Sequence, residues 1–366
     1  MFTFKRLNRV TIAVILAALA VPIVYAADTS TAPSTTLSIS SAIAPEYEVI
    51  HNAGDENDDD DDDCDNGDDS DDGSRWHNNQ ENQIVFEDKS PVMPPLPPTI
   101  QAPQPFPQWL TDLTGLHTWP GQNPPYIPQA HINLKNLPEV PLRELGACAG
   151  VDDRHCAFDC TKCIAPDEVV TCHNLTQTFD DGPGPATVRL LEALPGRTTF
   201  FTQGINVVRF PETFRLQHAR GHLLASHTWS HGNLAGLSNE QVAAQIQWSI
   251  WAMNATAGVI PLYFRPPYGA TDNRVRAITR QFGLIGVYWN RDTFDWRVND
   301  GQKTPKQVLD NVRGWLSETD PITREVHGIM LEHDSTEDVV SVGIEVARLL
   351  GPQLTIAECF NAAWYQ

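Results

Sequence analysis

The feature that most constrains the fold is a repeated alternation of segment types that begins near residue 172. Short apolar segments such as LTQTF and TTFFTQ are each followed by a longer amphipathic segment such as ATVRLLEAL, and the pattern continues to about residue 355. Strands that alternate with helices in this way predict a parallel sheet with helices packed against it. We therefore expect an α/β fold, either an open parallel sheet or a barrel.

Five short polar segments interrupt this pattern in a fixed order. They are TFDDGP at 178–183, HTWSH at 227–231, RPPYG at 265–269, DTFDW at 292–296 and LEHD at 331–334. Each lies at the C-terminal end of a predicted strand or in the loop that follows it. Because α/β barrels carry their chemistry at that end of the strands, we expect the five segments to meet in one site.

Two histidines and two adjacent carboxylates supply the groups for a metal site. His227 and His231 are four residues apart, so both imidazoles can reach one ion if the segment makes a single turn, although histidines at this spacing also serve as caps or core hydrogen bonders. Of Asp180 and Asp181, one can be the third ligand while the other receives a proton, but a DDGP segment is also common as an ordinary turn. Three protein ligands leave positions open for water and substrate, as in hydrolytic metal sites.

The remaining motif residues suit acyl transfer. His333 ends the last predicted strand and can protonate a nitrogen leaving group. Arg265 can hold a carboxylate through its planar guanidinium, and Asp295 can orient an imidazole. Taken singly, a surface ion pair for Arg265 and core packing for Trp296 are the more common roles, so the prediction depends on the conjunction of all five segments.

The N-terminal part differs in composition from the rest of the chain. Residues 1–26 have a cationic start and an apolar run, which is typical of a cleaved secretory signal peptide, with a retained anchor as the alternative. Much of the net charge of −21 lies in an almost continuous aspartate run at 55–72, and proline-rich sequence follows it. We expect residues 27–135 to be a disordered acidic and Pro-rich linker, and residues 136–366 to be the folded domain.

Cysteine usage agrees with an exported protein. Six of the seven cysteines lie in the expected domain, five of them between residues 148 and 172, and the sixth is Cys359. We expect three disulfides, one of which joins the end of the domain to its beginning, with the connectivity left open. A zinc ribbon built on Cys160 and Cys163 is the alternative. Cys64 is left over, and sequons at Asn174 and Asn254 would accept glycans.

The five segments resemble the signature motifs of the polysaccharide deacetylases, the NodB-like carbohydrate esterase family 4. The resemblance runs from about residue 172 to 355, and the stretch from TTFFTQ to HTWSH is also similar to that family. It implies a distorted (β/α) barrel with fewer than eight strands, preceded by a disordered N-terminal extension. It also implies one divalent metal, Zn²⁺ by default with Co²⁺ as an alternative.

The resemblance assigns roles to the motif residues. It implies a general base, three metal ligands and a general acid, which are, in that order, Asp180, then Asp181, His227 and His231, then His333. Arg265 would orient the base, and Asp295 would tune the acid. Trp296 and Leu331 would form walls of the acetyl pocket, and the backbone N–H of Tyr268 would help to stabilise the oxyanion.

Within the family, the cysteine-rich segment and the signal peptide most resemble the exported chitin deacetylases of fungi. The resemblance implies hydrolysis of the N-acetyl group of GlcNAc residues in chitin, giving chitosan and acetate. The alternatives are an O-acetyl esterase or deacetylase acting on xylan or peptidoglycan, and a non-catalytic carbohydrate-binding wall protein.

We expect a secreted, monomeric protein in the extracellular space or cell wall, with no nucleic-acid partner and no membrane span after signal removal. The aspartate run is interpreted as a solvated spacer, with loose cation binding or attraction of cationic chitosan as alternatives.

Overall fold

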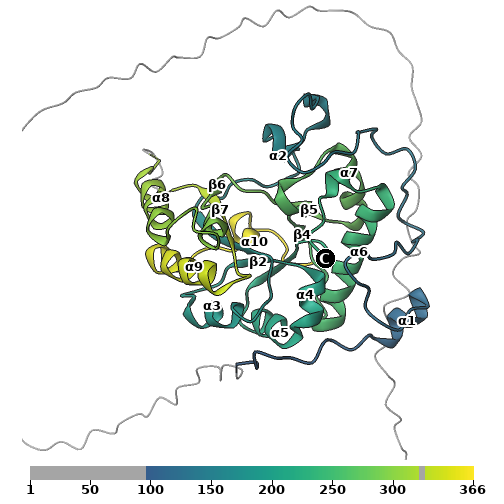
Figure 1. Cartoon of the computed structure of the whole chain (residues 1–366), viewed down its shortest axis with the longest axis horizontal. Helices are drawn as coiled ribbons and strands as arrows, with labels where there is room; N and C mark the ends of the chain where they lie inside the picture. Colours follow the sequence, from purple (N-terminus) through teal and green to yellow (C-terminus); the bar gives the residue numbers. More distant parts are fainter. Residues whose placement is uncertain (1–95, 321–325) are drawn as a thin grey trace, which may run out of the picture. The chain divides into compact units, whose positions relative to one another are not determined.

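The computed structural model describes residues 96–366, except for 321–325 (Figure 1). The predicted signal peptide, the aspartate run and Cys64 therefore lie outside the described residues. No helix in the described part of the chain is long and apolar enough to cross a membrane.

The centre of the fold is a parallel sheet with the strand order β5-β4-β3-β2-β1-β7-β6. The strands are β1 (Leu175–Asp180), β2 (Thr199–Thr202), β3 (Leu223–Ser226), β4 (Tyr263–Phe264), β5 (Ile285–Gly286), β6 (Arg291–Asp292) and β7 (Gly328–His333). All pairings between neighbouring strands are parallel, and the longest joins β1 to β7 in register from Leu175↔Gly328 to Asp180↔His333. The predicted parallel α/β architecture is confirmed.

Helices precede, connect and follow the strands, and most of them lie around the outside of the sheet (Figure 1). They are α1 (Gln108–Thr114), α2 (Phe158–Thr161), α3 (Thr187–Ala193), α4 (Gly204–Arg209), α5 (Pro211–Ala219), α6 (Asn239–Ala257), α7 (Asn273–Thr279), α8 (Pro305–Ser317), α9 (Glu337–Leu350) and α10 (Ile356–Cys359). Short 3₁₀ turns are η1 (Asp153–His155), η2 (Leu234–Gly236), η3 (Pro267–Gly269), η4 (Arg280–Phe282) and η5 (Asp295–Val298).

The chain length between the two edge strands shows that the sheet is curled. Strand β5 ends at Gly286 and β6 begins at Arg291, although these strands are at opposite ends of the strand order. The connecting residues can span at most about 18 Å. Seven flat strands would separate the edges by about 29 Å. The sheet must therefore curve until its edges approach each other, which is the expected distorted barrel.

Side chains pack on both faces of the curled sheet. Phe200 faces a cluster formed with the outer helices, whereas its neighbour Phe201 belongs to a cluster with Leu223 and Ile329. This alternation follows from the two-residue period of a strand. Ile356 of α10 joins the cluster that contains Phe201. The core that surrounds the strands therefore fixes where their C-terminal ends, and the motifs on them, are placed.

The expected linker boundary at residue 135 is wrong for the last part of that segment. Residues 96–135 lie on the domain: Leu110 of α1 is fully buried, and Phe106 and Trp119 pack against the main core cluster. The proline density prevents regular strands, but it does not prevent apolar side chains from packing. Glutamine side chains also form hydrogen bonds with polar groups of the irregular backbone. For example, Gln247 accepts a hydrogen bond from the N–H of Ile127.

Three disulfides are present, as predicted, and their pairing is now defined: Cys148–Cys160, Cys156–Cys163 and Cys172–Cys359. The last joins the chain end to the segment before β1. Because Cys160 and Cys163 both belong to disulfides, the zinc-ribbon alternative is excluded.

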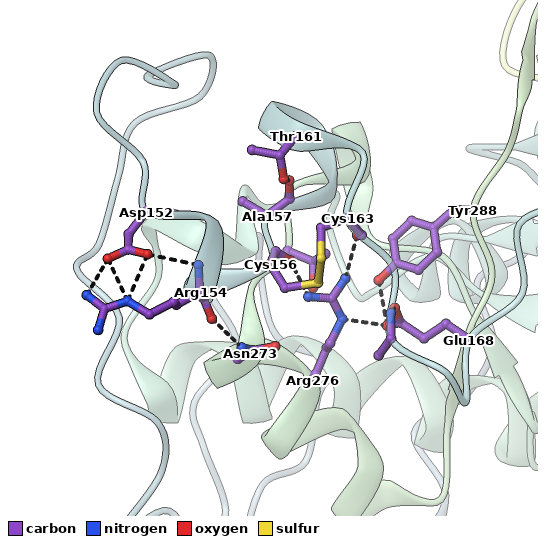
Figure 2. Close-up of a disulfide and its surroundings, with 12 residues drawn as sticks. Asp152, Arg154, Cys156, Ala157, Thr161, Cys163, Glu168, Asn273, Arg276 and Tyr288 are labelled. Atoms are coloured by element: carbon purple, nitrogen blue, oxygen red, sulfur yellow. Dashed lines mark hydrogen bonds and ion pairs between the residues drawn. A yellow bond between two sulfur atoms is a disulfide. The ribbon is translucent and has the colours of Figure 1, made fainter. Parts of the chain in front are cut away.

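The cysteine-rich segment is attached to the barrel through Arg276 of α7. Figure 2 shows its guanidinium donating to the carbonyls of Cys156 and Cys163 and to the carboxylate of Glu168, which also accepts the hydroxyl of Tyr288 at 2.8 Å. Arg276 is buried, so its donors find their partners within the protein rather than in water. This segment is thus part of the folded domain.

Candidate active site

Asp180 ends β1 and lies against a buried arginine. Nη1 of Arg265 donates to Oδ1 of Asp180 at 2.8 Å, and also to the hydroxyl of Thr178 at 2.8 Å. The remaining guanidinium nitrogens point to the carbonyls of Val287 and Tyr288, across the barrel interior. Arg265 therefore joins β1 to the segment after β5, and it holds the Asp180 carboxylate in one orientation.

The environment of Asp180 makes its carboxylate unusually basic. Burial raises the pKa of Asp180 to about 6, although attraction to Arg265 and His333 opposes the shift. A carboxylate with a pKa near the working pH can accept a proton during catalysis.

The three predicted metal ligands lie together. Nε2 of His231 is 3.3 Å from Oδ1 of Asp181, and Nε2 of His227 is 3.6 Å from the same oxygen. The ligand atoms of these three residues all lie within 4.8 Å of one another. The structure thus places the three predicted ligands together, with Asp180 directed to Arg265 and Asp181 to the histidines, while their role as metal ligands stays a prediction.

The histidine segment makes a turn at residues 228–230, but the backbone of this turn is not helical. Thr228 and His231 have φ values of 66° and 62°, and Asp181 has a φ of 83°. Positive φ is uncommon for residues other than glycine, and it persists where the surroundings hold it in place. An irregular loop, rather than a helical turn, directs both imidazoles to Asp181.

The histidines are held in the neutral form that a metal requires. Burial lowers the pKa of His227 to about 3, and repulsion from His231 adds to the shift. Nδ1 of His227 lies 2.8 Å from the carbonyl oxygen of Arg265. A carbonyl can only accept a hydrogen bond, so Nδ1 carries the proton and the Nε2 lone pair faces Asp181.

His333 ends β7 and is paired with a buried carboxylate. Oδ1 of Asp295 is 2.7 Å from Nδ1 of His333, and Oδ2 accepts the backbone N–H of His333 at 2.8 Å. Burial opposes a charged imidazole, but attraction to Asp295 outweighs it and raises the pKa of His333 to about 10. His333 is therefore a protonated group at neutral pH.

These groups line one cavity of about 560 Å³, whose walls are formed by Leu145, Asp180, Asp181, His227, His231, Tyr268, Trp289, Asp292, Trp296, Asn299, Leu331, His333 and Ser335. The side chains of Tyr268 and Trp296 are 48% and 41% exposed, which leaves their rings accessible to a ligand. Arg265 and Asp295 are fully buried behind the wall. They can position the reacting groups but are not among the residues that line the cavity.

Some contributors to the site were not singled out from the sequence. Gln203 donates to Oδ1 of Asp181 at 3.0 Å, and Asp334 accepts the backbone N–H of Gly182 at 2.8 Å. Gln203 ends the segment TTFFTQ, and Asp334 ends the motif LEHD. Leu145 lies just before the cysteine-rich segment and outside all five motifs, so no local pattern could have assigned it to the cavity.

A second cluster with metal-ligand atoms does not compete with this site. It consists of Cys148, Asp159 and Cys160. Both sulfurs are joined in a disulfide, and the carboxylate of Asp159 is paired with Arg143 at 2.5 Å.

The C-terminal ends of the curled parallel sheet thus bring together a possible metal site, formed by Asp181, His227 and His231, with a basic aspartate and a protonated histidine beside it. This arrangement is typical of hydrolases built on an α/β barrel. The comparisons with known proteins are consistent with this class. Residues 168–287 match the family model described as polysaccharide deacetylase.

Two relatives from Saccharomyces cerevisiae cover most of the folded part of the chain. Chitin deacetylase 1 is 50% identical over 264 residues, which are 71% of this chain and 85% of the relative. Chitin deacetylase 2 is 47% identical over 71% of this chain and 82% of the relative. The chain therefore belongs to the polysaccharide deacetylase family, and the enzyme class predicted from the five motifs is confirmed.

Among solved structures, the chitin deacetylase of Colletotrichum lindemuthianum matches 54% of this chain and 95% of its own, with 27% identity and a TM-score of 0.46. The peptidoglycan deacetylase PdaC of Bacillus subtilis matches 54% of this chain and 93% of its own, with 28% identity and a TM-score of 0.44.

Proposed function

We propose that this protein hydrolyses the N-acetyl group of GlcNAc residues in chitin, giving chitosan and acetate. The observation that carries the proposal is that a buried carboxylate, a metal-ligand triplet and a protonated histidine line one cavity. The choice of chitin is supported by the two yeast relatives, which are named chitin deacetylases.

The residues fit the metal that the family implies. Asp181, His227 and His231 offer one oxygen and two nitrogen donors in a compact triplet, and burial keeps His227 neutral. This donor set suits Zn²⁺, with Co²⁺ as an alternative. When bound, such a metal acts as a Lewis acid toward the acyl oxygen and makes water more acidic.

Asp180 is the proposed general base. Its carboxylate lines the cavity beside the ligand triplet, with Oδ2 3.8 Å from Nε2 of His227, while Oδ1 is held by Arg265. It would accept the proton of the attacking water. Arg265 keeps the carboxylate from rotating and stabilises its charge, so we assign it a positioning role.

His333 is the proposed general acid. An amide cannot be cleaved readily unless the leaving nitrogen is protonated, and the raised pKa of His333 means that the proton is present at neutral pH. Asp295 fixes Nδ1 of the imidazole and leaves Nε2 to face the substrate. A bound cation would lower the pKa of Asp180 and that of His333, because it favours the ionised aspartate and disfavours the imidazolium.

The other predicted substrate contacts follow from the cavity. The proposal is that Trp296 and Leu331 form the walls around the acetyl group, since both line the cavity and the Trp296 ring is accessible. The proposed oxyanion contact from the backbone N–H of Tyr268 is supported by the position of this residue next to His231, with ring centroids 4.5 Å apart.

The location of the protein is also a proposal. Three disulfides in the described domain fit an oxidising compartment, which supports export to the extracellular space or cell wall. We propose a monomer that acts on wall polysaccharide.

Substrate choice is tested by acetate release from three polymers: chitin oligomers, acetylated xylan and peptidoglycan fragments. The proposal expects release from the chitin oligomers. Release from xylan alone would show an O-acetyl esterase, and binding of chitin without any release in the presence of metal would show a non-catalytic carbohydrate-binding protein.

A further inference from the structure

The N-terminal strap, which we define as residues 101–127, contacts the loop between the two histidine ligands. Trp229 and Ser230 lie in that loop. Nε1 of Trp229 donates to the carbonyl of Gly121 at 2.7 Å, and the hydroxyl of Ser230 donates to the carbonyl of Gln122 at 2.6 Å. Two successive residues of the strap therefore accept hydrogen bonds from two successive residues of the metal-ligand loop.

Aromatic packing strengthens this contact. Trp229 is fully buried, and its ring is stacked on Trp119 of the strap with centroids 6.1 Å apart and an interplanar angle of 20°. Trp248 of α6 packs against both rings. Stacked aromatic pairs contribute beyond the area that they bury, so the strap holds Trp229 in a specific orientation.

Gln245 of α6 completes the support from the other side. Its side-chain oxygen accepts the backbone N–H of Trp229 at 3.1 Å and that of Ser230 at 2.9 Å. Its amide nitrogen donates to the Ser230 hydroxyl at 2.8 Å and lies 3.4 Å from the carbonyl of Gln122. The loop is therefore held between the helix and the strap.

The loop needs such support because its backbone is irregular. The positive φ values of Thr228 and His231 on either side of Trp229 cost free energy, and they persist only where neighbouring groups hold the chain. Regular secondary structure does not provide this constraint, since β3 ends at Ser226 and α6 begins at Asn239.

The strap is itself anchored away from the loop. Gln104 N–H donates to the carbonyl of Val208 at 2.8 Å, and Nε1 of Trp248 donates to the carbonyl of Pro125 at 2.7 Å. The match to the family model begins at residue 168, so the strap lies outside that match. The strap packs against the main core cluster and reaches the loop between the two histidines.

We infer that the strap is a positioning element for metal binding: the carbonyls of Gly121 and Gln122 hold Trp229 and Ser230 so that His227 and His231 both face Asp181. This inference rests on the proposed role of these three residues as metal ligands. None of the strap residues named here touches the reacting groups, so they act through the loop.

The test compares two tryptophans that make the same bond to the strap. Trp229→Phe and Trp248→Phe each remove one indole N–H that donates at 2.7 Å to a strap carbonyl, and both side chains are fully buried. Only Trp229 lies between the ligands. The matched control therefore separates loss of strap packing from loss of loop positioning.

The measurement is titration of the metal-stripped full-length protein with Co²⁺, followed by the visible absorption of the bound ion. We expect Trp229→Phe to weaken Co²⁺ binding by about tenfold and to change the spectrum, because a displaced loop would move both imidazoles away from Asp181, with an effect like that of losing the support of a metal ligand. Trp248→Phe keeps an aromatic ring against Trp229 and leaves both hydrogen bonds between the loop and the strap in place, so it should weaken Co²⁺ binding much less than Trp229→Phe does. Urea unfolding checks that both variants are folded. Ser230→Ala should weaken binding, and Ser230→Thr should restore it.

Two results would overturn the inference. Wild-type affinity and spectrum in Trp229→Phe would show that the strap does not position the loop. Equal weakening in Trp248→Phe would show a general packing effect. A different result would show that Asp181, His227 and His231 are not the metal ligands: in that case Asp181→Asn would bind Co²⁺ as tightly as the wild type. This outcome is distinct from a failure of the strap to position the loop.

Discussion

Each reacting group in the cavity has a buried partner on its far side. Arg265 lies behind Asp180, and its own carbonyl oxygen accepts from His227, so one residue orients both the proposed base and a proposed metal ligand. Asp295 holds His333 through its imidazole and its backbone. The proposed chemistry thus depends on two residues, Arg265 and Asp295, that are buried and do not line the cavity.

Replacement of the base tests the division between the two adjacent aspartates. Asp180→Asn should lower the rate of acetate release by about 10²–10⁴-fold, because the amide cannot accept a proton. Co²⁺ affinity should be largely retained, since Asp180 is paired with Arg265. The matched variant Asp181→Asn should lose both metal binding and activity. Full acetate release by Asp180→Asn would contradict the assignment.

Removal of Arg265 should change the pH dependence of the reaction. The base must be ionised, so activity falls as the pH decreases through the pKa of Asp180, which burial raises to about 6 and which attraction to Arg265 lowers. In Arg265→Gln that attraction is lost, the pKa rises further, and the acidic limb of kcat/KM moves to higher pH. A lower rate with an unmoved limb would show that Arg265 has only a structural role.

At the scale of secondary-structure elements, one histidine joins β2 to β3. Nδ1 of His222, just before β3, accepts the backbone N–H of Thr198, just before β2, at 3.1 Å. Burial lowers the pKa of His222 to about 4, and repulsion from Arg220 and Arg197 adds to the shift. A proton on Nδ1 would face the Thr198 N–H and break the bond.

The pKa of His222 predicts a pH-dependent loss of stability. The unfolded chain binds a proton at His222 near pH 6.5, whereas the folded protein does so only near pH 4. The free energy of unfolding therefore decreases as the pH falls between these values, by about 3 kcal/mol from this group. Urea unfolding of the wild type and His222→Gln at several pH values checks this, because the glutamine offers an acceptor that does not titrate. Parallel curves for the two proteins would contradict the prediction.

At the scale of the whole molecule, the disulfides differ in how much chain they enclose. Cys172–Cys359 spans 187 residues and joins the chain end to the start of β1, whereas Cys156–Cys163 spans 7. Closing a long loop restricts the unfolded chain more than closing a short one.

Removal of the long disulfide should therefore cost more stability. Cys172→Ala/Cys359→Ala should lower the free energy of unfolding by about 2–5 kcal/mol, and Cys156→Ala/Cys163→Ala by less. Urea unfolding under oxidising conditions measures both. An equal or reversed order would show that local packing, rather than loop closure, governs their contributions.

The sequence predicted the parallel barrel, and it predicted that the five motifs meet at one end of the strands, because strand-and-helix alternation and the motif positions are local patterns. It did not predict that residues 96–135 belong to the domain. Their proline-rich composition indicates an extended tether, yet the segment contains the short helix α1 and packs on the domain. The place of Trp119 depends on its folded partner Trp229, which no local pattern shows. The sequence also did not predict that Leu145 lines the cavity, because its place there depends on how the segment around the cysteines folds onto the barrel.

The most direct test of the central claim is acetate release and product mass from a GlcNAc pentamer, with metal-stripped protein before and after addition of Zn²⁺. We predict no release without metal, and stepwise loss of acetyl groups with an unbroken sugar chain once Zn²⁺ is added. Release that is unaffected by metal removal, or no release at all with Zn²⁺ bound, would contradict the account.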